Sequence, residues 1–159
     1  MRVHLAGDHA AYDLKTHLAQ HLAQGGHEVV DHGPTGYDAE DDYPVFVLRA
    51  AEAVAADPGA LALVLGGSGN GEQIAANRVP GVRAALGWSL ETARLARQHN
   101  DANALGVGAR MHTLQEATAI VDAFLAEPFS GEERHARRIA MLTRYEQDHE
   151  LPPLPGRLA

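Results

Sequence analysis

A glycine-rich loop with one carboxylate is the segment of this sequence best suited to chemistry. The apolar run 60–65 is typical of a buried strand, and it ends in four glycines interleaved with Ser68 and Asn70. Glycine lets backbone amides approach a ligand closely, because it has no Cβ atom. Glu72 follows where a helix over 73–77 is expected to begin, and the free amides of a helix start favour an anion. The loop therefore predicts a general base that acts on a small anionic substrate.

The spacing of this loop excludes two well-known phosphate-binding motifs. No Lys-Ser or Lys-Thr pair follows the glycines, so the loop is not a Walker A motif. It also lacks the third glycine of the dinucleotide fingerprint, and it follows the third expected strand. A tight turn without a ligand is the alternative that the loop alone leaves open.

Two other pairs of polar residues are candidates for a site. Asp8 and His9 follow the first expected strand, and His99 and Asn100 lie between an expected helix and the last strand. Asp8 could equally cap a helix, with His9 in solvent. A histidine such as His99, taken alone, is more often structural than catalytic. Each pair becomes a stronger candidate for a functional site only in combination with the other loops.

Histidines and arginines on the expected helices give a further set of candidates. Arg134, Arg137 and Arg138 share one face of the last helix, and guanidinium groups bind phosphate oxygens in pairs. The alternative is a solvated basic face. His17 and His21 also share a helical face, but no glutamate-rich metal motif accompanies them, so we expect them at the surface.

Strands and helices are expected to alternate along the whole chain. The apolar patterns predict strands over 3–6, 27–31, 60–65, 82–86 and 104–107, and helices around Leu14, Leu18 and Leu22 and over 45–56, 73–77, 90–98, 114–125 and 132–149. This alternation predicts a parallel sheet with helices on both faces. Ligands bind such sheets at the carboxyl ends of the strands. The rule selects residues 7–9, the glycine loop and residues 108–110.

Composition narrows the class of protein. The chain has 159 residues, 45% of them hydrophobic, which suits one domain over 1–150 and a proline-rich tail over 151–159. A formal charge of -8 disfavours binding to nucleic acid or to an anionic membrane. The chain has no cysteine, its first residues resemble a strand more than a signal peptide, and no apolar run reaches membrane-spanning length. We therefore expect a cytoplasmic protein. The acidic segment 33–44 is longer than a usual connection, which indicates a functional or interface loop.

Four motifs in this order resemble a known family. They are Gly7-Asp8-His9-Ala10, the run from Gly66 to Glu72 with Ile74-Ala75-Ala76-Asn77, Arg97-Gln98-His99-Asn100-Asp101, and Arg134-His135 with Arg138. Their order and spacing over residues 1–150 resemble the type B ribose-5-phosphate isomerases, whose family includes allose-6-phosphate and galactose-6-phosphate isomerases. The resemblance implies a Rossmann-like three-layer α/β/α sandwich with a five-stranded parallel sheet. It also implies a homodimer, or a dimer of dimers, with active sites at the subunit interface.

The resemblance implies an activity as well. Family members interconvert aldose and ketose phosphates, here D-ribose 5-phosphate and D-ribulose 5-phosphate of the pentose phosphate pathway, through an enediolate and without metal or cofactor. In one branch a cysteine takes the proton from C2, but this chain has Gly66 at that position. It is similar to the actinobacterial-type branch, in which a glutamate at the position of Glu72 is the base.

The remaining site residues follow from the same resemblance. It implies that His99 opens the furanose ring, and that Asp8, His9 and Asn100 contact the substrate. Residues Gly67, Ser68, Gly69, Asn70 and Gly71 would hold the reacting end of the sugar. The phosphate would lie among Arg110, Arg134 and Arg138, with a site completed across the dimer interface.

Two other function classes remain open at this point. A sugar-phosphate sensor would use the same pocket and bind without turnover. A phosphatase or phosphoryl-transfer protein would use Asp8 and the arginines, but it would need a metal or a phosphoryl acceptor. The glycine loop with Glu72 fits that chemistry poorly.

Overall fold

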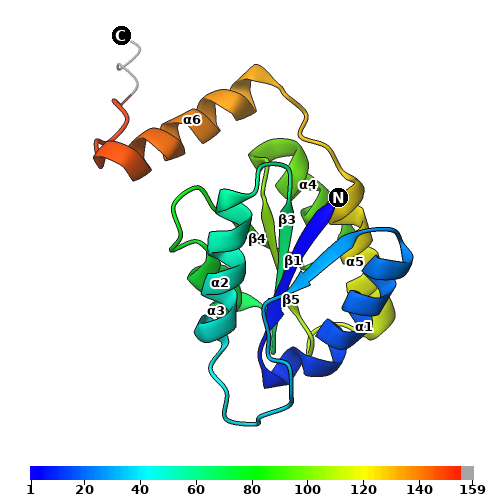
Figure 1. The fold of residues 1–159 in the computed structure, drawn as a ribbon. Coiled ribbons are helices and arrows are strands. Elements are labelled where there is room, and N and C mark those ends of the chain that lie inside the picture. Colours follow the sequence, from blue (N-terminus) through cyan, green and yellow to red (C-terminus); the bar gives the residue numbers. More distant parts are fainter. Residues whose placement is uncertain (155–159) are drawn as a thin grey trace.

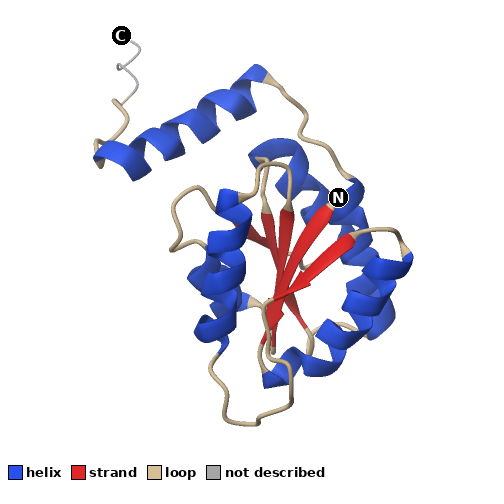
Figure 2. Cartoon of the chain, viewed as in Figure 1, coloured by secondary structure: helices blue, strands red, loops and turns tan. Residues whose placement is uncertain are grey.

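The fold is built on one parallel sheet. The computed structural model describes residues 1–154, which form five strands in the order β2-β1-β3-β5-β4, with every neighbouring pair parallel (Figure 2). The strands are β1 (Arg2–Gly7), β2 (Glu28–Asp31), β3 (Leu61–Gly66), β4 (Ala84–Leu86) and β5 (Ala104–Gly108). All five expected strands are therefore present. Below, the C-terminal edge is the edge of the sheet at which the strands end, and the N-terminal edge is the one at which they begin.

Helices cover both faces of this sheet. They are a short 3₁₀ helix η1 (His9–Ala11), α1 (Tyr12–Gln24), α2 (Tyr43–Ala56), α3 (Asn70–Ala76), α4 (Leu90–Asn100), α5 (Leu114–Ala126) and α6 (Glu133–Asp148). One apolar cluster joins the sheet to α1, α4 and α5, and a second joins the opposite face to α2 and α3. This arrangement is the three-layer sandwich that the resemblance implies.

The central strand β3 explains why its sequence is a continuous apolar run. β3 is buried along its whole length. Leu61, Leu63 and Leu65 pack into the cluster with α1, α4 and α5, while Ala62 and Val64 pack into the other cluster. Successive side chains of a strand point to opposite faces, so a strand covered on both faces must be apolar throughout.

Two of the helix boundaries that differ from the expectation move predicted site residues. α3 begins at Asn70, because Gly69 (φ 80°) takes a left-handed conformation directly before it. Glu72 therefore lies in the first turn of α3 and not ahead of it. α4 continues through Asn100, so His99 and Asn100 occupy its last turn, where a connection was expected.

The last helix stands apart from the sandwich. α6 runs beyond the N-terminal edge of the sheet (Figure 1), and His135 is its buried residue. Met141, Leu142 and Tyr145 are apolar and exposed on it. Residues 151–154 contain no helix or strand, and the rest of the expected tail, residues 155–159, lies outside the described residues. Among the described residues, no helix is long and apolar enough to cross a membrane.

Candidate active site

Three loops meet at the C-terminal edge, as the sheet rule predicts. The N–H groups of Ala109 and Arg110 donate to the carbonyls of Gly66 and Gly67, at 2.8 Å and 3.0 Å. A Cβ atom on Gly67 would lie 3.6 Å from Nη1 of Arg110 and 3.7 Å from Cβ of Ala10. The segments after β1, β3 and β5 are thus in contact, and they bring Asp8, His9, the glycine loop, Glu72 and Arg110 to one edge.

The carboxylate of Glu72 lies directly against Gly66. Glu72 is only 4% exposed. A Cβ atom on Gly66 would lie 1.8 Å from Oε1 of Glu72, which is far inside van der Waals contact. The carboxylate therefore occupies the space that a side chain at position 66 would fill.

Burial makes Glu72 a stronger base than an exposed glutamate. Desolvation is the largest influence and raises the pKa of Glu72, and the charge of Asp8 raises it further. The backbone N–H of Glu72 acts in the opposite direction and lowers the pKa. Burial and a helix start thus act on this carboxylate in opposite directions. In the structure, burial dominates.

Asp8 has the capping role that the sequence left open. Its side chain is buried, and Oδ1 accepts the N–H of Ala10 at 3.0 Å at the start of η1. Its charge nevertheless acts on Glu72. Asp8 thus organises the end of β1 and also contributes to the electrostatics of the site.

His9 has a partner that the sequence analysis missed. Oδ1 of Asp41 accepts hydrogen bonds from the main-chain N–H of His9 and from ring atom Nδ1, each at 2.8 Å. The hydrogen bond to Asp41 is the largest influence on the pKa of His9 and raises it, while partial burial lowers it. The long acidic loop was noted in the sequence, but nothing there linked Asp41 to a residue so far along the chain.

The glycine loop carries its own contacts. Oγ of Ser68 accepts the main-chain N–H of Asn70 at 3.3 Å and its side-chain amide at 3.2 Å. A Cβ atom on Gly71 would lie 2.8 Å from Cζ of Tyr43, so the phenol ring covers this glycine. Tyr43 is a second residue beside the site that the sequence analysis missed: the sequence pattern places it in the acidic segment 33–44, whereas it begins α2.

The other predicted site residues lie at the N-terminal edge of the sheet. His99 and Asn100 end α4 just before β5 begins, whereas Arg110 follows the end of β5. A strand of five residues spans about 16 Å, so one subunit does not bring His99 to Glu72. Instead, the ring of His99 stacks on that of His135, with centroids 4.2 Å apart and planes 10° apart.

The C-terminal arginines lie on the same side as His99. Arg134, Arg137 and Arg138 are exposed on α6. Nε of Arg134 pairs with Oε2 of Glu132 at 2.8 Å, and more than half of each side chain is exposed. The predicted site is therefore divided between the two edges of the sheet.

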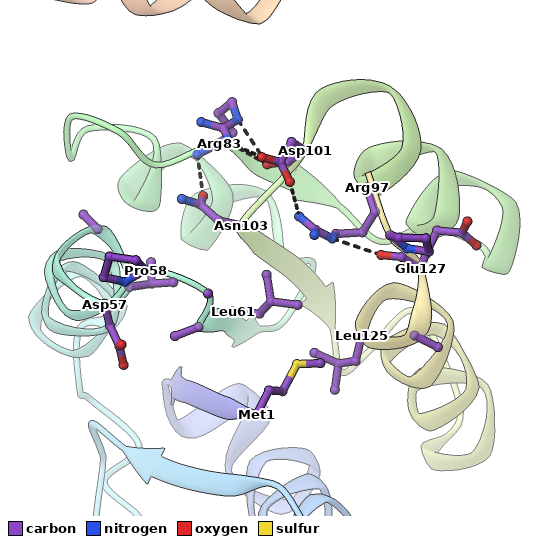
Figure 3. A pocket seen from close by; sticks show the side chains of 16 residues that line it. Met1, Asp57, Pro58, Leu61, Arg83, Arg97, Asp101, Asn103, Leu125 and Glu127 are labelled. Atoms are coloured by element: carbon purple, nitrogen blue, oxygen red, sulfur yellow. Dashed lines mark hydrogen bonds and ion pairs between the residues drawn. The ribbon is translucent and has the colours of Figure 1, made fainter. Parts of the chain in front are cut away.

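A cavity of about 620 Å³, drawn in Figure 3, opens at the N-terminal edge, and Glu72 does not line it. Its arginines already have partners within the chain. Arg97 donates to Oδ1 of Asp101 and to the carbonyls of Ala102 and Glu127, and Arg83 donates to the carbonyl and carboxylate of Asp101. These guanidinium groups hold the ends of β4, α4 and α5 together, which is a structural role.

Three residues at the C-terminal edge have the ligand types of a cation site. Asp8, His9 and Asp41 offer ligand atoms that lie within 4.8 Å of one another. Nδ1 of His9 and Oδ1 of Asp41 are already bonded to each other, and Oδ1 of Asp8 caps η1. The contacts present are those of an ion pair and a helix cap.

Comparison with known proteins identifies the family. Ribose-5-phosphate isomerase B of Mycobacterium tuberculosis is 60% identical over 156 residues, which cover 98% of this chain and 96% of that protein. The Escherichia coli protein of the same name is 39% identical, over 88% of this chain and 93% of its own length. The structure of the Mycoplasma genitalium ribose-5-phosphate isomerase B with bound ribulose-5-phosphate superposes with a TM-score of 0.89 at 42% identity, covering 92% of this chain and 97% of that one. A family model described as Ribose/Galactose Isomerase matches residues 3–142, and the chain belongs to that family.

Proposed function

We propose that this protein interconverts D-ribose 5-phosphate and D-ribulose 5-phosphate, as an aldose-ketose isomerase of the pentose phosphate pathway. The observation that carries the proposal is the carboxylate of Glu72, buried against Gly66 within a glycine-rich loop. The activity named for the relatives, and the ribulose-5-phosphate bound to one of them, support the choice of substrate.

Glu72 is the proposed base. The reaction moves one hydrogen between C2 and C1, so it needs a group that takes a proton beside a carbonyl and returns it to the neighbouring carbon. A buried carboxylate with a raised pKa suits both halves of this transfer. The contact with Gly66 supports the replacement of the cysteine base, because the glutamate fills the space of that side chain.

The glycine loop is the proposed site for the negative charge of the enediolate. Residues 67–71 follow the end of β3 and lie beside Glu72, and their free amides are the proposed donors to the reacting end of the sugar. Fixed amide donors stabilise an oxyanion strongly, and the loss of one such donor in other enzymes costs about 3 kcal/mol. Neither metal nor cofactor is required for this step.

A second copy of the chain would complete the site. His99, Asn100, Arg134 and Arg138 lie at the edge opposite to Glu72, so they can serve a pocket only from a neighbouring subunit. We therefore propose a homodimer, alone or paired into a tetramer, with active sites at the interface. The exposed arginines of α6, together with Met141 and Leu142 on the same helix, support this assembly.

The histidine stack supports His99 as the acid that opens the furanose ring. Two imidazoles stacked at 4.2 Å do not both carry a charge easily. Burial lowers the pKa of His135, and the neighbouring His99 lowers it further. His135 is therefore held toward its neutral form, and its ring keeps that of His99 in a fixed orientation.

A coupled assay on the purified protein tests the proposal. Ribose 5-phosphate, allose 6-phosphate and galactose 6-phosphate are offered in parallel, with and without the Glu72→Gln change. We expect the unaltered protein to turn over ribose 5-phosphate and the Glu72→Gln variant to show no turnover. Binding without turnover would indicate a sensor, and release of inorganic phosphate would indicate a phosphatase.

A further inference from the structure

We propose that Asp41 is a positioning residue, which holds the imidazole of His9 as a cation and directs its Nε2–H toward the phosphate of the substrate. This inference rests on the proposed function, because it assigns His9 to the phosphate group of the same sugar phosphate. It adds a residue from the long acidic loop to a site built on strand ends.

The geometry fixes the ring in one orientation. A single oxygen, Oδ1 of Asp41, accepts both the main-chain N–H and the ring Nδ1 of His9, each at 2.8 Å. Because the main chain and the ring of His9 are both bonded to this oxygen, the ring has little rotational freedom. The side chain of Asp41 is 8% exposed, whereas that of His9 is 27% exposed. The carboxylate is therefore an internal support, and the ring is the outward group.

His9 borders a cavity. It lines a hollow of about 280 Å³ together with Tyr12, Asp13, Tyr37 and Ala109. Ala109 directly precedes Arg110, so a group in this region can meet both an imidazolium and a guanidinium. Charged donors of this kind bind phosphate oxygens more strongly than neutral ones do.

The charges around His9 come from three elements. Asp8 precedes η1, Asp13 lies in the first turn of α1, and Asp41 belongs to the loop before α2. Tyr37 meets the ring edge-on with centroids 6.5 Å apart, and Arg110 is the cation on the neighbouring loop. The hydrogen bond to Asp41 and the charge of Asp8 raise the pKa of His9. The positive charge is complete below the ordinary histidine pKa and is lost as the pH rises through the raised value.

The test compares Asp41→Asn with Asp42→Asn. Asparagine keeps the shape and the acceptor oxygen of Asp41 but removes the charge. Asp42 is the exposed neighbour and makes no side-chain cap, so its change removes the same charge from the same loop. We expect Asp41→Asn to raise the KM for ribose 5-phosphate about tenfold at pH 7.5, with kcat within about twofold. Asp42→Asn should leave both constants unchanged.

A second readout needs no turnover. The His9 ring is titrated by NMR in the presence and absence of inorganic phosphate. Asp41→Asn should lower the pKa of His9 and weaken phosphate binding, and the KM should begin to rise at a lower pH. An unchanged His9 titration, or an unchanged KM in a folded variant, overturns the inference. Absence of isomerase activity in the unaltered protein would instead remove the proposed function.

A third variant covers the case in which Asp41→Asn does not fold. His9→Asn keeps the main-chain contact to Asp41 and removes the ring. If the inference is right, the rise in KM at the pKa measured for His9 is absent from this variant, and adding Asp41→Asn to it changes the KM no further. A rise in KM at that same pH that survives in His9→Asn overturns the inference.

Discussion

The two edges of the sheet present opposite kinds of site. At the C-terminal edge, Glu72 and Asp8 are buried, and Asp8 has a hydrogen-bond partner within the chain. At the N-terminal edge, Arg134 and Arg138 are exposed, and His99 is partly exposed beside His135. The first edge is organised before any ligand arrives, whereas His99, Arg134 and Arg138 lie outside the cavity that opens at the second edge. Under the proposed function, one subunit therefore holds the proton-transfer half of its own site and supplies the other half to the site of a neighbouring subunit.

Removal of the base gives the largest expected effect. Glu72→Gln keeps the shape but cannot accept a proton, so turnover should fall below about 1% of normal, since general bases contribute about 10²- to 10⁴-fold. Binding of ribose 5-phosphate, measured by calorimetry, should remain. Glu91→Gln, in the exposed first turn of α4, is the matched control and should be fully active. Retention of more than a few per cent of activity would remove Glu72 as the base.

Mixing subunits tests the division between the edges directly. Arg110→Ala damages one edge and Arg134→Ala the other, so each variant alone should be nearly inactive, with the KM raised more than kcat is lowered. In a mixed dimer one pocket has both defects and the other has none. Random pairing gives about half heterodimers, and hence roughly a quarter of normal sites. No recovery, with heterodimers confirmed by native mass spectrometry, would mean that the arginines do not act across an interface.

Loss of His99 should have a smaller and directional effect. Ribulose 5-phosphate is acyclic, so His99→Asn should slow turnover of the cyclic ribose phosphate more than that of the ketose. Single-turnover rates in both directions measure this without the equilibrium constraint on steady-state ratios. His149→Asn, on the exposed end of α6, is the control. Equal losses in both directions would contradict a role in ring opening.

Replacement of the proposed base should increase the stability of the fold. Burial raises the pKa of Glu72 above its unfolded value. A raised pKa contributes stability below the unfolded pKa, and this contribution is lost as the pH rises through the folded pKa. The ionised group therefore destabilises the fold at pH 7, and Glu72→Gln should raise the free energy of unfolding by about 1 kcal/mol. Urea denaturation should find that this gain shrinks toward pH 4, and a constant difference would contradict the assignment.

Chelators and thiol reagents should leave the isomerase activity unchanged. The chain has no cysteine, and the proposed steps use no metal. Activity is measured after treatment with EDTA and, separately, with iodoacetamide. The EDTA treatment is informative because Asp8, His9 and Asp41 have potential metal-ligand atoms close to one another. Inactivation that a divalent ion reverses would place a metal at the C-terminal edge and end the cofactor-free mechanism.

The fold was largely predictable because it rests on local patterns. The continuous apolar run of β3 and the spacing of Leu14, Leu18 and Leu22 follow directly from how strands and helices bury side chains. The start of α3 was not predictable, since it depends on the left-handed conformation of Gly69. A glycine permits that conformation without requiring it.

The site was predictable only in part. Motif order indicated Glu72, Asp8 and the loops of the C-terminal edge, and the structure brings them together. Asp41 and Tyr43 were missed because their contacts, with His9 and Gly71, join distant segments and leave no periodic signal. The division of the site between two edges came from the family resemblance, and no single stretch of sequence encodes it.

The contact between Glu72 and Gly66 also limits how such a site can evolve. A side chain at position 66 and the present position of the Glu72 carboxylate exclude each other, because a Cβ atom there would lie 1.8 Å from Oε1. Under the proposed mechanism, a side chain gained at position 66 would therefore displace the carboxylate that acts as the base. The close packing of this loop thus couples two positions of the chain in evolution, so that a change at one alters the role open to the other.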